Sequence, residues 1–260
     1  MDCNDRNIIV TGAGGGIGRA LAQRFIQENA RSVSCVDLHE DAVQKTSKEL
    51  GAKAHAYQLD VTDEAALQEL VERIENQHGP VSVFCSNAGI AVPGGIETTN
   101  AELDASWQVN LLAHLYAARA MIPKMLERQE GYLINTASAA GLLTQIGSLS
   151  YAITKHAAVS LAESLAITYG DKGIRVSVLC PQAVRTAMTA GSENGGVAGV
   201  DGMLEPEAVA QEVIRVMGTE EFLILPHPEV LTYMRRKTDD YDRWIGGMRR
   251  LRDRYLDNQA

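Results

Sequence analysis

Seven short apolar runs recur along the chain, and longer stretches with helical periodicity separate them. The runs are largely apolar at consecutive positions, as expected of strands that are covered on both faces of their sheet. Strands that alternate with helices in this way form parallel sheets with helices on both sides. We therefore predict one α/β domain with a doubly wound, seven-stranded parallel sheet. The predicted strands cover residues 7–11, 33–37, 55–60, 81–85, 132–136, 175–180 and 222–225.

The first predicted strand runs directly into the glycine-rich sequence T-G-A-G-G-G-I-G, residues 11–18, and an amphipathic stretch follows. Glycines let a backbone approach a pyrophosphate closely, and the N-terminus of the next helix favours negative charge. The spacing is G-x-x-x-G-x-G, because Ile17 occupies the last position of a strict G-x-G-x-x-G. A turn without a ligand has a similar composition. The strand–loop–helix context favours a dinucleotide site of the Rossmann type.

An acidic residue, Asp37, ends the second predicted strand, nineteen residues after Gly18. A carboxylate in that place accepts hydrogen bonds from an adenosine ribose and repels a 2′-phosphate. No Lys or Arg adjoins it, and Gly16 offers no side chain to such a phosphate. Asp37 could equally cap the following helix, and the two roles are compatible. We predict NAD rather than NADP.

A tyrosine and a lysine, Tyr151 and Lys155, are spaced so that they share one face of a helix, one turn apart. An ammonium stabilises a phenolate, so we expect the pKa of Tyr151 to fall below its usual value of about 10. Such a tyrosine exchanges a proton with an alcohol or a ketone. Ser138 follows an apolar strand and is placed to hold the reacting oxygen. The Tyr-x-x-x-Lys spacing is common in helices, so this interpretation depends on the rest of the chain.

Asp60 with Val61 closes the third predicted strand, and Asn87 with Ala88 and Gly89 follows the fourth. Doubly wound folds bind ligands at that edge of the sheet, although each residue alone is more often part of a turn or a cap.

Asn110 lies inside an apolar helical stretch, where an amide is unfavourable unless it has hydrogen-bond partners. Structural and functional roles are equally compatible with its position.

Six motifs occur over residues 6–226 in an order that closely resembles the single-domain branch of the short-chain dehydrogenase/reductase family. The resemblance implies a catalytic tetrad and a set of cofactor contacts. The tetrad is Asn110, Ser138, Tyr151 and Lys155. The implied NAD contacts are Gly12, Gly14, Gly15, Gly16, Ile17, Gly18, Asp37, Leu38, Asp60, Val61, Asn87, Ala88, Gly89, Tyr151, Lys155, Pro181, Val184 and Thr186.

The resemblance also implies a mechanism, which is reversible hydride transfer with Tyr151 as general acid and base. Ser138 would position the substrate oxygen, Lys155 would lower the tyrosine pKa and hold the nicotinamide ribose, and Asn110 would order a water that passes protons from Lys155 to solvent. The chain departs from the family at Gln182, where a glycine is usual. This departure concerns the backbone on the nicotinamide side.

Residues 187–205 are rich in glycine and lack periodicity, so we predict a substrate lid, although a mobile surface loop has the same composition. Residues 90–95 and 139–146 are the other expected walls. They carry no Lys or Arg, and Arg185 is the only cation nearby in sequence. We therefore expect a neutral, largely apolar secondary alcohol or ketone, steroid-like or bulky and aromatic. The alternatives are a small polar carbonyl, a catalytically silent NAD-binding regulator, and a sugar-nucleotide epimerase or dehydratase.

The C-terminal residues 231–260 hold eight Lys or Arg against five Asp, in a chain whose formal net charge is −9. Tyr241, Trp244, Met248, Leu251 and Tyr255 recur at helical steps, which predicts a C-terminal helical extension with one apolar face and solvated arginines. A basic amphipathic helix of this kind can also bind an anionic membrane surface.

The composition bounds the partners. The acidic balance argues against nucleic-acid binding, and no apolar run is long enough for stable membrane insertion. The four cysteines are scattered, which favours buried thiols and a cytoplasmic enzyme without metal. We expect a small-molecule substrate and a homodimer or homotetramer.

Overall fold

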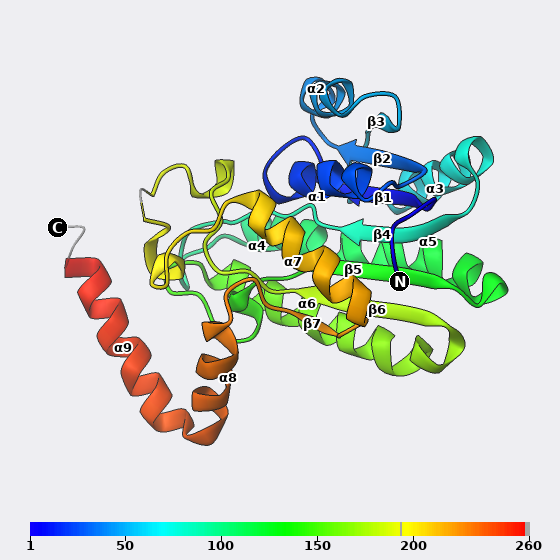
Figure 1. Cartoon of the computed structure of the whole chain (residues 1–260). Helices are drawn as coiled ribbons and strands as arrows, with labels where there is room; N and C mark the ends of the chain where they lie inside the picture. The colour runs from blue at the N-terminus through cyan, green and yellow to red at the C-terminus, as the bar shows by residue number, and fades with distance from the viewer. Residues whose placement is uncertain (193, 258–260) are drawn as a thin grey trace.

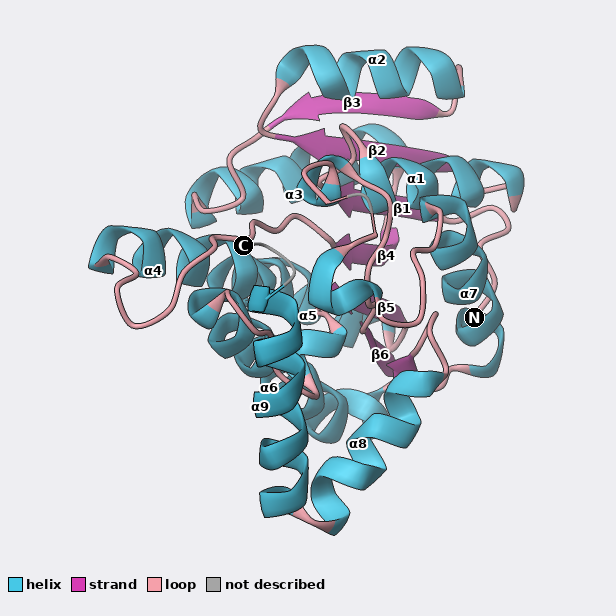
Figure 2. Ribbon diagram, turned by 90° about the vertical axis from the view of Figure 1, so that its left-hand side faces the viewer, coloured by secondary structure: helices cyan, strands magenta, loops and turns pink. Residues whose placement is uncertain are grey.

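The computed structural model describes residues 1–192 and 194–257, and these residues form one seven-stranded parallel sheet flanked by helices (Figure 1). The strand order is β3-β2-β1-β4-β5-β6-β7, with β3 at the top and β6 towards the bottom of Figure 2. This confirms the predicted doubly wound sheet. The strands are β1 (Asn7–Thr11), β2 (Ser32–Asp37), β3 (Ala54–Gln58), β4 (Val81–Ser86), β5 (Gly131–Thr136), β6 (Ile174–Leu179) and β7 (Leu223–Ile224).

Two helical layers bury the two faces of the sheet in separate apolar clusters. Side chains alternate along a strand, so that Ile8 and Val10 of β1 join one cluster and Ile9 joins the other. One layer contains α1 (Gly16–Gln27), α2 (Glu40–Leu50) and α7 (Pro206–Thr219). The other contains α3 (Glu64–His78), α5 (Ala113–Arg128) and α6 (Leu149–Tyr169). Burial on both faces explains why the strands are apolar at consecutive positions.

The strand order reverses between β1 and β4, which both lie at the centre of the sheet. Chains leave such neighbouring strands in opposite directions, and the crevice between them is where doubly wound folds bind ligands. β1 ends at Thr11 and β4 at Ser86, so the glycine-rich loop and the Asn87 turn meet at this point.

Two predicted strands are shorter than expected. β3 ends at Gln58, and Asp60 lies in a turn in which its Oδ1 accepts hydrogen bonds from the Thr62 amide at 2.9 Å and the Thr62 hydroxyl at 2.7 Å. β7 consists of two residues only. The apolar runs continue beyond these strands because their side chains still pack on the core: Leu59, Phe222 and Leu225 are partly buried against it.

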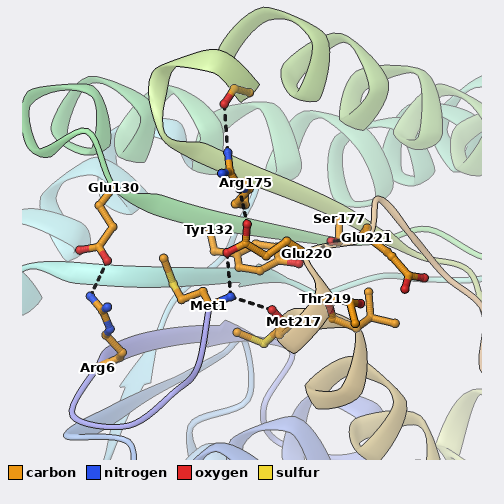
Figure 3. Close-up of polar contacts among 12 residues, drawn as sticks. Met1, Arg6, Glu130, Tyr132, Arg175, Ser177, Met217, Thr219, Glu220 and Glu221 are labelled. Atoms are coloured by element: carbon orange, nitrogen blue, oxygen red, sulfur yellow. Dashed lines mark hydrogen bonds and ion pairs between the residues drawn. The ribbon is translucent and has the colours of Figure 1, made fainter.

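Polar contacts near the amino ends of β5 and β6 tie these strands to the end of α7 (Figure 3). The Glu220 carboxylate accepts from Arg175 Nε at 2.5 Å and from the Met1 amine at 2.8 Å, which holds the pKa of Glu220 below its usual value. The hydroxyls of Tyr132 and Ser177 are 2.7 Å apart, and Ser177 donates to the Glu221 carbonyl. These contacts therefore lie at the opposite end of the strands from the carboxyl edge of the sheet.

Two C-terminal helices, α8 (Glu229–Asp239) and α9 (Tyr241–Asp257), form a hairpin that projects from the sheet layers (Figure 1). The extended residue Asp240 separates the two helices. Residues 258–260 of the predicted extension lie outside the described residues. The hairpin is anchored by Lys237, which is 8% exposed and donates from Nζ to the carbonyls of Leu142 and Leu143 at 2.9 and 2.8 Å.

All four cysteines are free and buried, which confirms the prediction of buried thiols. Among the described helices, none has both the length and the apolar composition needed to cross a bilayer.

Two backbone segments of the glycine-rich loop, at Gly12 and Gly18, approach each other closely where α1 begins. Gly12 adopts a left-handed conformation with φ of +67°. A side chain at Gly18 would collide with the Gly12 carbonyl and with the Asn87 amide, whereas Gly15 is extended and faces open space. The close approach therefore requires glycine at position 18 but not at position 15.

We expect Gly18→Ala to destabilise the protein by about 1–3 kcal/mol, because the added methyl group overpacks a contact between two backbone segments. Gly15→Ala is the matched control, and its effect on folding should be within about 0.5 kcal/mol. Urea unfolding without added ligand measures both. Equal stability of the two variants would contradict the close approach described here.

Candidate active site

The N-terminus of α1 presents its free amides to the crevice. Gly15 is the N-cap residue and, among the described residues, no side chain caps this end. Gly16 has φ of +49°, a conformation that favours glycine. An uncapped helix N-terminus reached through a glycine loop is suited to bind phosphate.

Asp37 holds the glycine loop from the neighbouring strand. Its Oδ2 accepts from the Gly14 amide at 2.9 Å, and its Oδ1 accepts from the His39 amide at 3.0 Å. The sequence allowed Asp37 to be the N-cap of the following helix. In the structure the N-cap residue of α2 is His39 instead. The carboxylate lies at the tip of β2, beside the loop.

The Asn87-Ala88-Gly89 turn ties three strand ends together. The amides of Asn87 and Ala88 donate to Thr11 Oγ1 at 2.9 and 3.1 Å, and Asn87 Nδ2 donates to the Thr11 carbonyl. Asn87 Oδ1 accepts from the Thr136 hydroxyl at 3.1 Å. The turn therefore fixes β1, β4 and β5 relative to one another at the carboxyl edge.

Asn110 lies in a short π-helix, η1 (Gln108–Leu112), between α4 (Asn100–Trp107) and α5. The side chain is fully buried. Its Oδ1 accepts from the Ile90 amide at 2.9 Å, and its Nδ2 donates to the Ile90 carbonyl at 2.9 Å and to Thr154 Oγ1 at 3.1 Å. These bonds satisfy the amide, and π-helical turns of this kind are frequent at functional sites.

Lys155 reaches the same place from α6. Its Nζ donates to the Thr136 carbonyl at 2.9 Å and lies 5.6 Å from the centre of the Tyr151 ring. A side chain at Gly89 would lie 3.2 Å from Asn110 Oδ1 and 3.4 Å from Lys155 Nζ, so Gly89 leaves room for these two groups. The structure thus places Lys155 between Tyr151 and the Asn110 turn.

Ser138 stands at the end of β5, before the short helix η2 (Ala139–Gly141). Its hydroxyl accepts from the Ala140 amide at 3.1 Å and donates to the Pro181 carbonyl at 3.4 Å. This hydroxyl also influences the titration of Tyr151 and lines the large cavity described below. The four tetrad residues named from the sequence are therefore brought to one site.

The expected fall in the pKa of Tyr151 is wrong for this structure. Burial raises the pKa of Tyr151 above its usual value, and the Ser138 hydroxyl opposes this only in part. Burial also lowers the pKa of Lys155 to about 8. Desolvation penalises the charged form of each group, and it is the largest cause of both pKa shifts.

The sequence and the structure were compared with those of known proteins. A family model for short chain dehydrogenases matches residues 6–195. The 1-deoxy-11-beta-hydroxypentalenate dehydrogenase of Streptomyces exfoliatus is 35% identical over 252 residues, which cover 94% of this chain and 91% of that protein. The chain belongs to the short-chain dehydrogenase/reductase family.

One further sequence relative and one solved structure are also similar to this chain. Estradiol 17-beta-dehydrogenase 11 of Mus musculus is 30% identical over 84% of this chain and 74% of that protein. A short-chain dehydrogenase/reductase from Burkholderia phymatum, whose crystal structure is a complex with NAD, matches with a TM-score of 0.85. That structure is 27% identical, and the match covers 93% of this chain and 96% of that one.

A cavity of about 700 Å³ extends from Ser138 to the C-terminal hairpin of this dehydrogenase. The expected wall at residues 139–146 contributes to it, whereas residues 90–95 are not among the described residues that line it. The segment 187–205, in which Glu193 lies outside the described residues, supplies Val197, Ala198 and Val200. The hairpin supplies Tyr233, Arg236, Asp239, Asp240, Arg243, Trp244, Gly247, Met248, Arg250, Leu251 and Arg254.

The nicotinamide-side segment lies between the glycine loop and this cavity. The Pro181 carbonyl accepts from the Ala139 amide at 2.9 Å, Val184 is buried, and a side chain at Gly16 would meet Thr186. Gln182, at the position where a glycine is usual in the family, lines the cavity and donates from its amide to His227 Nδ1 at 3.2 Å.

The sequence-based expectation that Arg185 is the only cation near the substrate is wrong. Arg185 pairs with Glu205 at 2.8 Å and does not belong to the described lining of the large cavity, whereas four arginines of α8 and α9 do. The apolar stripe of α9 was visible in the sequence. That its neighbouring arginines face the cavity depends on where the hairpin docks.

His114 is a buried titratable group that sequence reasoning assigned no role. It lies one turn after Asn110 and is 1% exposed, and neither ring nitrogen has a hydrogen-bond partner within the described part of the chain. Burial lowers the pKa of His114 to about 3; the nearby charge of Lys155 acts in the same direction, and the adjacent Asn135 side chain opposes the shift. In the sequence, only the i, i+4 spacing from Asn110 indicates that His114 lies near the site.

We expect the buried His114 to make the protein sensitive to acid. Its pKa is lower in the folded state than in the unfolded chain, so the unfolded chain binds more protons below about pH 6.5 and stability falls as pH falls from 6.5 towards 3. Between pH 7.5 and 5.0 the loss due to this residue should be about 2 kcal/mol.

Urea unfolding at the two pH values measures this loss. His114→Leu should lose less stability on acidification than the native protein, and His39→Gln, an exposed control on the surface, should lose as much as the native protein. An unchanged acid loss in His114→Leu would refute the assignment.

Proposed function

We propose that the protein transfers a hydride reversibly between NAD and a bulky, largely apolar secondary alcohol or the corresponding ketone. The observation that carries this proposal is the convergence of Tyr151, Lys155 and Ser138 beside a cavity large enough for a multi-ring substrate. The uncapped N-terminus of α1, where a dinucleotide would bind, follows β1 at the carboxyl edge of the same sheet.

The residues present fit NAD. The free amides at the start of α1 and the glycine loop suit its pyrophosphate, and Asp37 at the tip of β2 suits an adenosine ribose without a 2′-phosphate. When bound, the nicotinamide supplies the hydride acceptor or donor. The proposed contacts remain those named from the sequence, with Thr186 and Gly16 lying against each other on the nicotinamide side.

Tyr151 is the proposed general acid and base. Because burial raises its pKa, the phenol is protonated at neutral pH and is ready to donate to a ketone oxygen. Alcohol oxidation requires the base form, so a nearby positive charge must offset desolvation, and Lys155 is the cation in place. Ser138 holds the substrate oxygen through its hydroxyl. Asn110 would order a water beside Lys155. The hydrogen bonds between Asn110 and Ile90 hold η1 in position for this role.

The substrate class rests on the cavity and on the relatives. Trp244, Met248 and Leu251 supply apolar lining, and the relatives include a hydroxypentalenate dehydrogenase and an estradiol dehydrogenase. We propose that residues 187–205 act as the lid of this cavity, since Val197, Ala198 and Val200 line it.

We also propose a homodimer or homotetramer that assembles through α6. Leu149, Ile153 and Ile167 of this helix are 40%, 42% and 84% exposed. Apolar side chains exposed along one helix are suited to a subunit interface.

We expect Tyr151→Phe to reduce turnover by about a hundredfold or more, which is the usual contribution of general acid–base catalysis. The native rate of alcohol oxidation should rise with pH, as the base form of the phenol is populated, and the residual rate of the variant should not. Tyr169→Phe is the matched control, because Tyr169 lies on the same helix with Lys172 5.3 Å from its ring centre. A control that loses as much activity as the variant would contradict the role of Tyr151.

We expect Asp37→Asn to shift the preference between cofactors towards NADP by about tenfold or more, because the charge that repels a 2′-phosphate is removed while an acceptor for the Gly14 amide is kept. The ratio of kcat/KM for NAD and NADP measures the shift. Asp63→Asn, which keeps a residue suited to cap α3, is the control and should leave the ratio unchanged. An unchanged ratio in Asp37→Asn would oppose the proposed ribose contact.

A further inference from the structure

Two adjacent stripes of α9 face the large cavity. Trp244, Met248 and Leu251 form an apolar stripe. Arg243, Arg250 and Arg254 form a basic stripe at similar helical steps, with Gly247 between the first two arginines. Arg236 of α8 adds a fourth guanidinium to the lining. The wall formed by the hairpin is therefore both apolar and strongly basic.

Within the part of the chain whose side chains the structure describes, no carboxylate forms an ion pair with any of these four guanidinium groups. Arg252, on another face of α9, pairs with Asp253. Asp239 and Asp240 also line the cavity, so its described lining carries four positive and two negative groups. This local excess of positive charge occurs in a chain with a net charge of −9.

The guanidinium group of Arg250 lies close to two glycines of α9. A side chain at Gly246 would lie 3.6 Å from Arg250 Nη1, and one at Gly247 would lie 3.8 Å from Arg250 Nη2. The Arg250 guanidinium thus lies along the two glycines, next to the part of the cavity that Gly247 lines.

The position of α9 is fixed at both ends. Lys237 bonds the Leu142 and Leu143 carbonyls and lies 5.1 Å from the Trp244 ring centre. At the other end, Tyr255 packs against Gly196 of η5 (Gly196–Gly199), and the tip of α9 lies beside this segment in Figure 1. The basic stripe is therefore held in place at the cavity.

We propose that the substrate is an amphipathic carboxylate, with its alcohol or ketone at Ser138, its apolar body against the apolar stripe, and its carboxylate held by Arg243 and Arg250. The inference rests on the function proposed above for this site, and it replaces the neutral substrate expected from the sequence. Guanidinium groups bind carboxylates through paired hydrogen bonds, and apolar surroundings strengthen such bonds. An anion also offsets the excess positive charge of the lining.

The decisive test compares acids with their neutral esters. The probes are two secondary alcohols of different length, 4-hydroxyadamantane-1-carboxylate and 4-(4-hydroxycyclohexyl)cyclohexanecarboxylate, each with its methyl ester. For at least one pair we expect kcat/KM with NAD to be about tenfold or more higher for the acid, mainly through KM. The double variant Arg243→Gln with Arg250→Gln should lose this preference, so that its kcat/KM values for acid and ester become equal.

Arg249→Gln is the matched control, because Arg249 is exposed on the same helix and does not belong to the described lining of the cavity. It should retain the preference for the acid. Equal rates on acid and ester in the native protein, or an equal loss in Arg249→Gln, would overturn the inference.

A binding measurement separates this inference from the proposed function. Calorimetry with adamantane-1-carboxylate and adamantane-1-carboxamide, in the presence of NAD, needs no turnover. Tighter binding of the carboxylate that disappears in the double variant would support the anion site even if none of the alcohols were oxidised, an outcome that would count against the reaction alone. Equal binding of both compounds, together with arginine-dependent pelleting on phosphatidylserine vesicles, would overturn the inference in favour of a membrane-binding helix.

Discussion

The hydrogen bonds that join Thr11, Asn87 and Thr136 hold the functional half of the molecule together. They fix the ends of three parallel strands at the point where the strand order reverses. The glycine loop continues from Thr11, and the Thr136 carbonyl accepts from Lys155. The position of the lysine and the shape of the proposed dinucleotide site are therefore set by the same short set of polar contacts, which are partly buried.

Burial decides the electrostatics. In water an ammonium beside a phenol lowers the pKa of the phenol, but here desolvation is the largest cause of both pKa shifts. Both members of the Tyr151–Lys155 pair are shifted towards their neutral forms. A site in this condition favours neutral partners until a ligand brings further charge, so the protonation state of the pair is coupled to what is bound nearby.

The sequence predicts what depends on local patterns. Buried parallel strands are visible as apolar runs, the glycine loop as a strand–loop–helix sequence, and the shared face of Tyr151 and Lys155 as a four-residue step. It does not predict what depends on depth or docking. The pKa of Tyr151 requires its burial, the isolation of His114 requires the packing of α5 on the sheet, and the role of the arginines requires the docking of α9. In each case the residue type was visible but its environment was made by distant segments.

The anchoring of Lys237 has a practical consequence for handling the protein. The same backbone that follows Ser138 supplies the carbonyls which receive this lysine, so the C-terminal hairpin and the serine-bearing loop are mechanically joined. Proteolytic trimming of α9 would remove residues that line the large cavity while leaving the glycine loop in place.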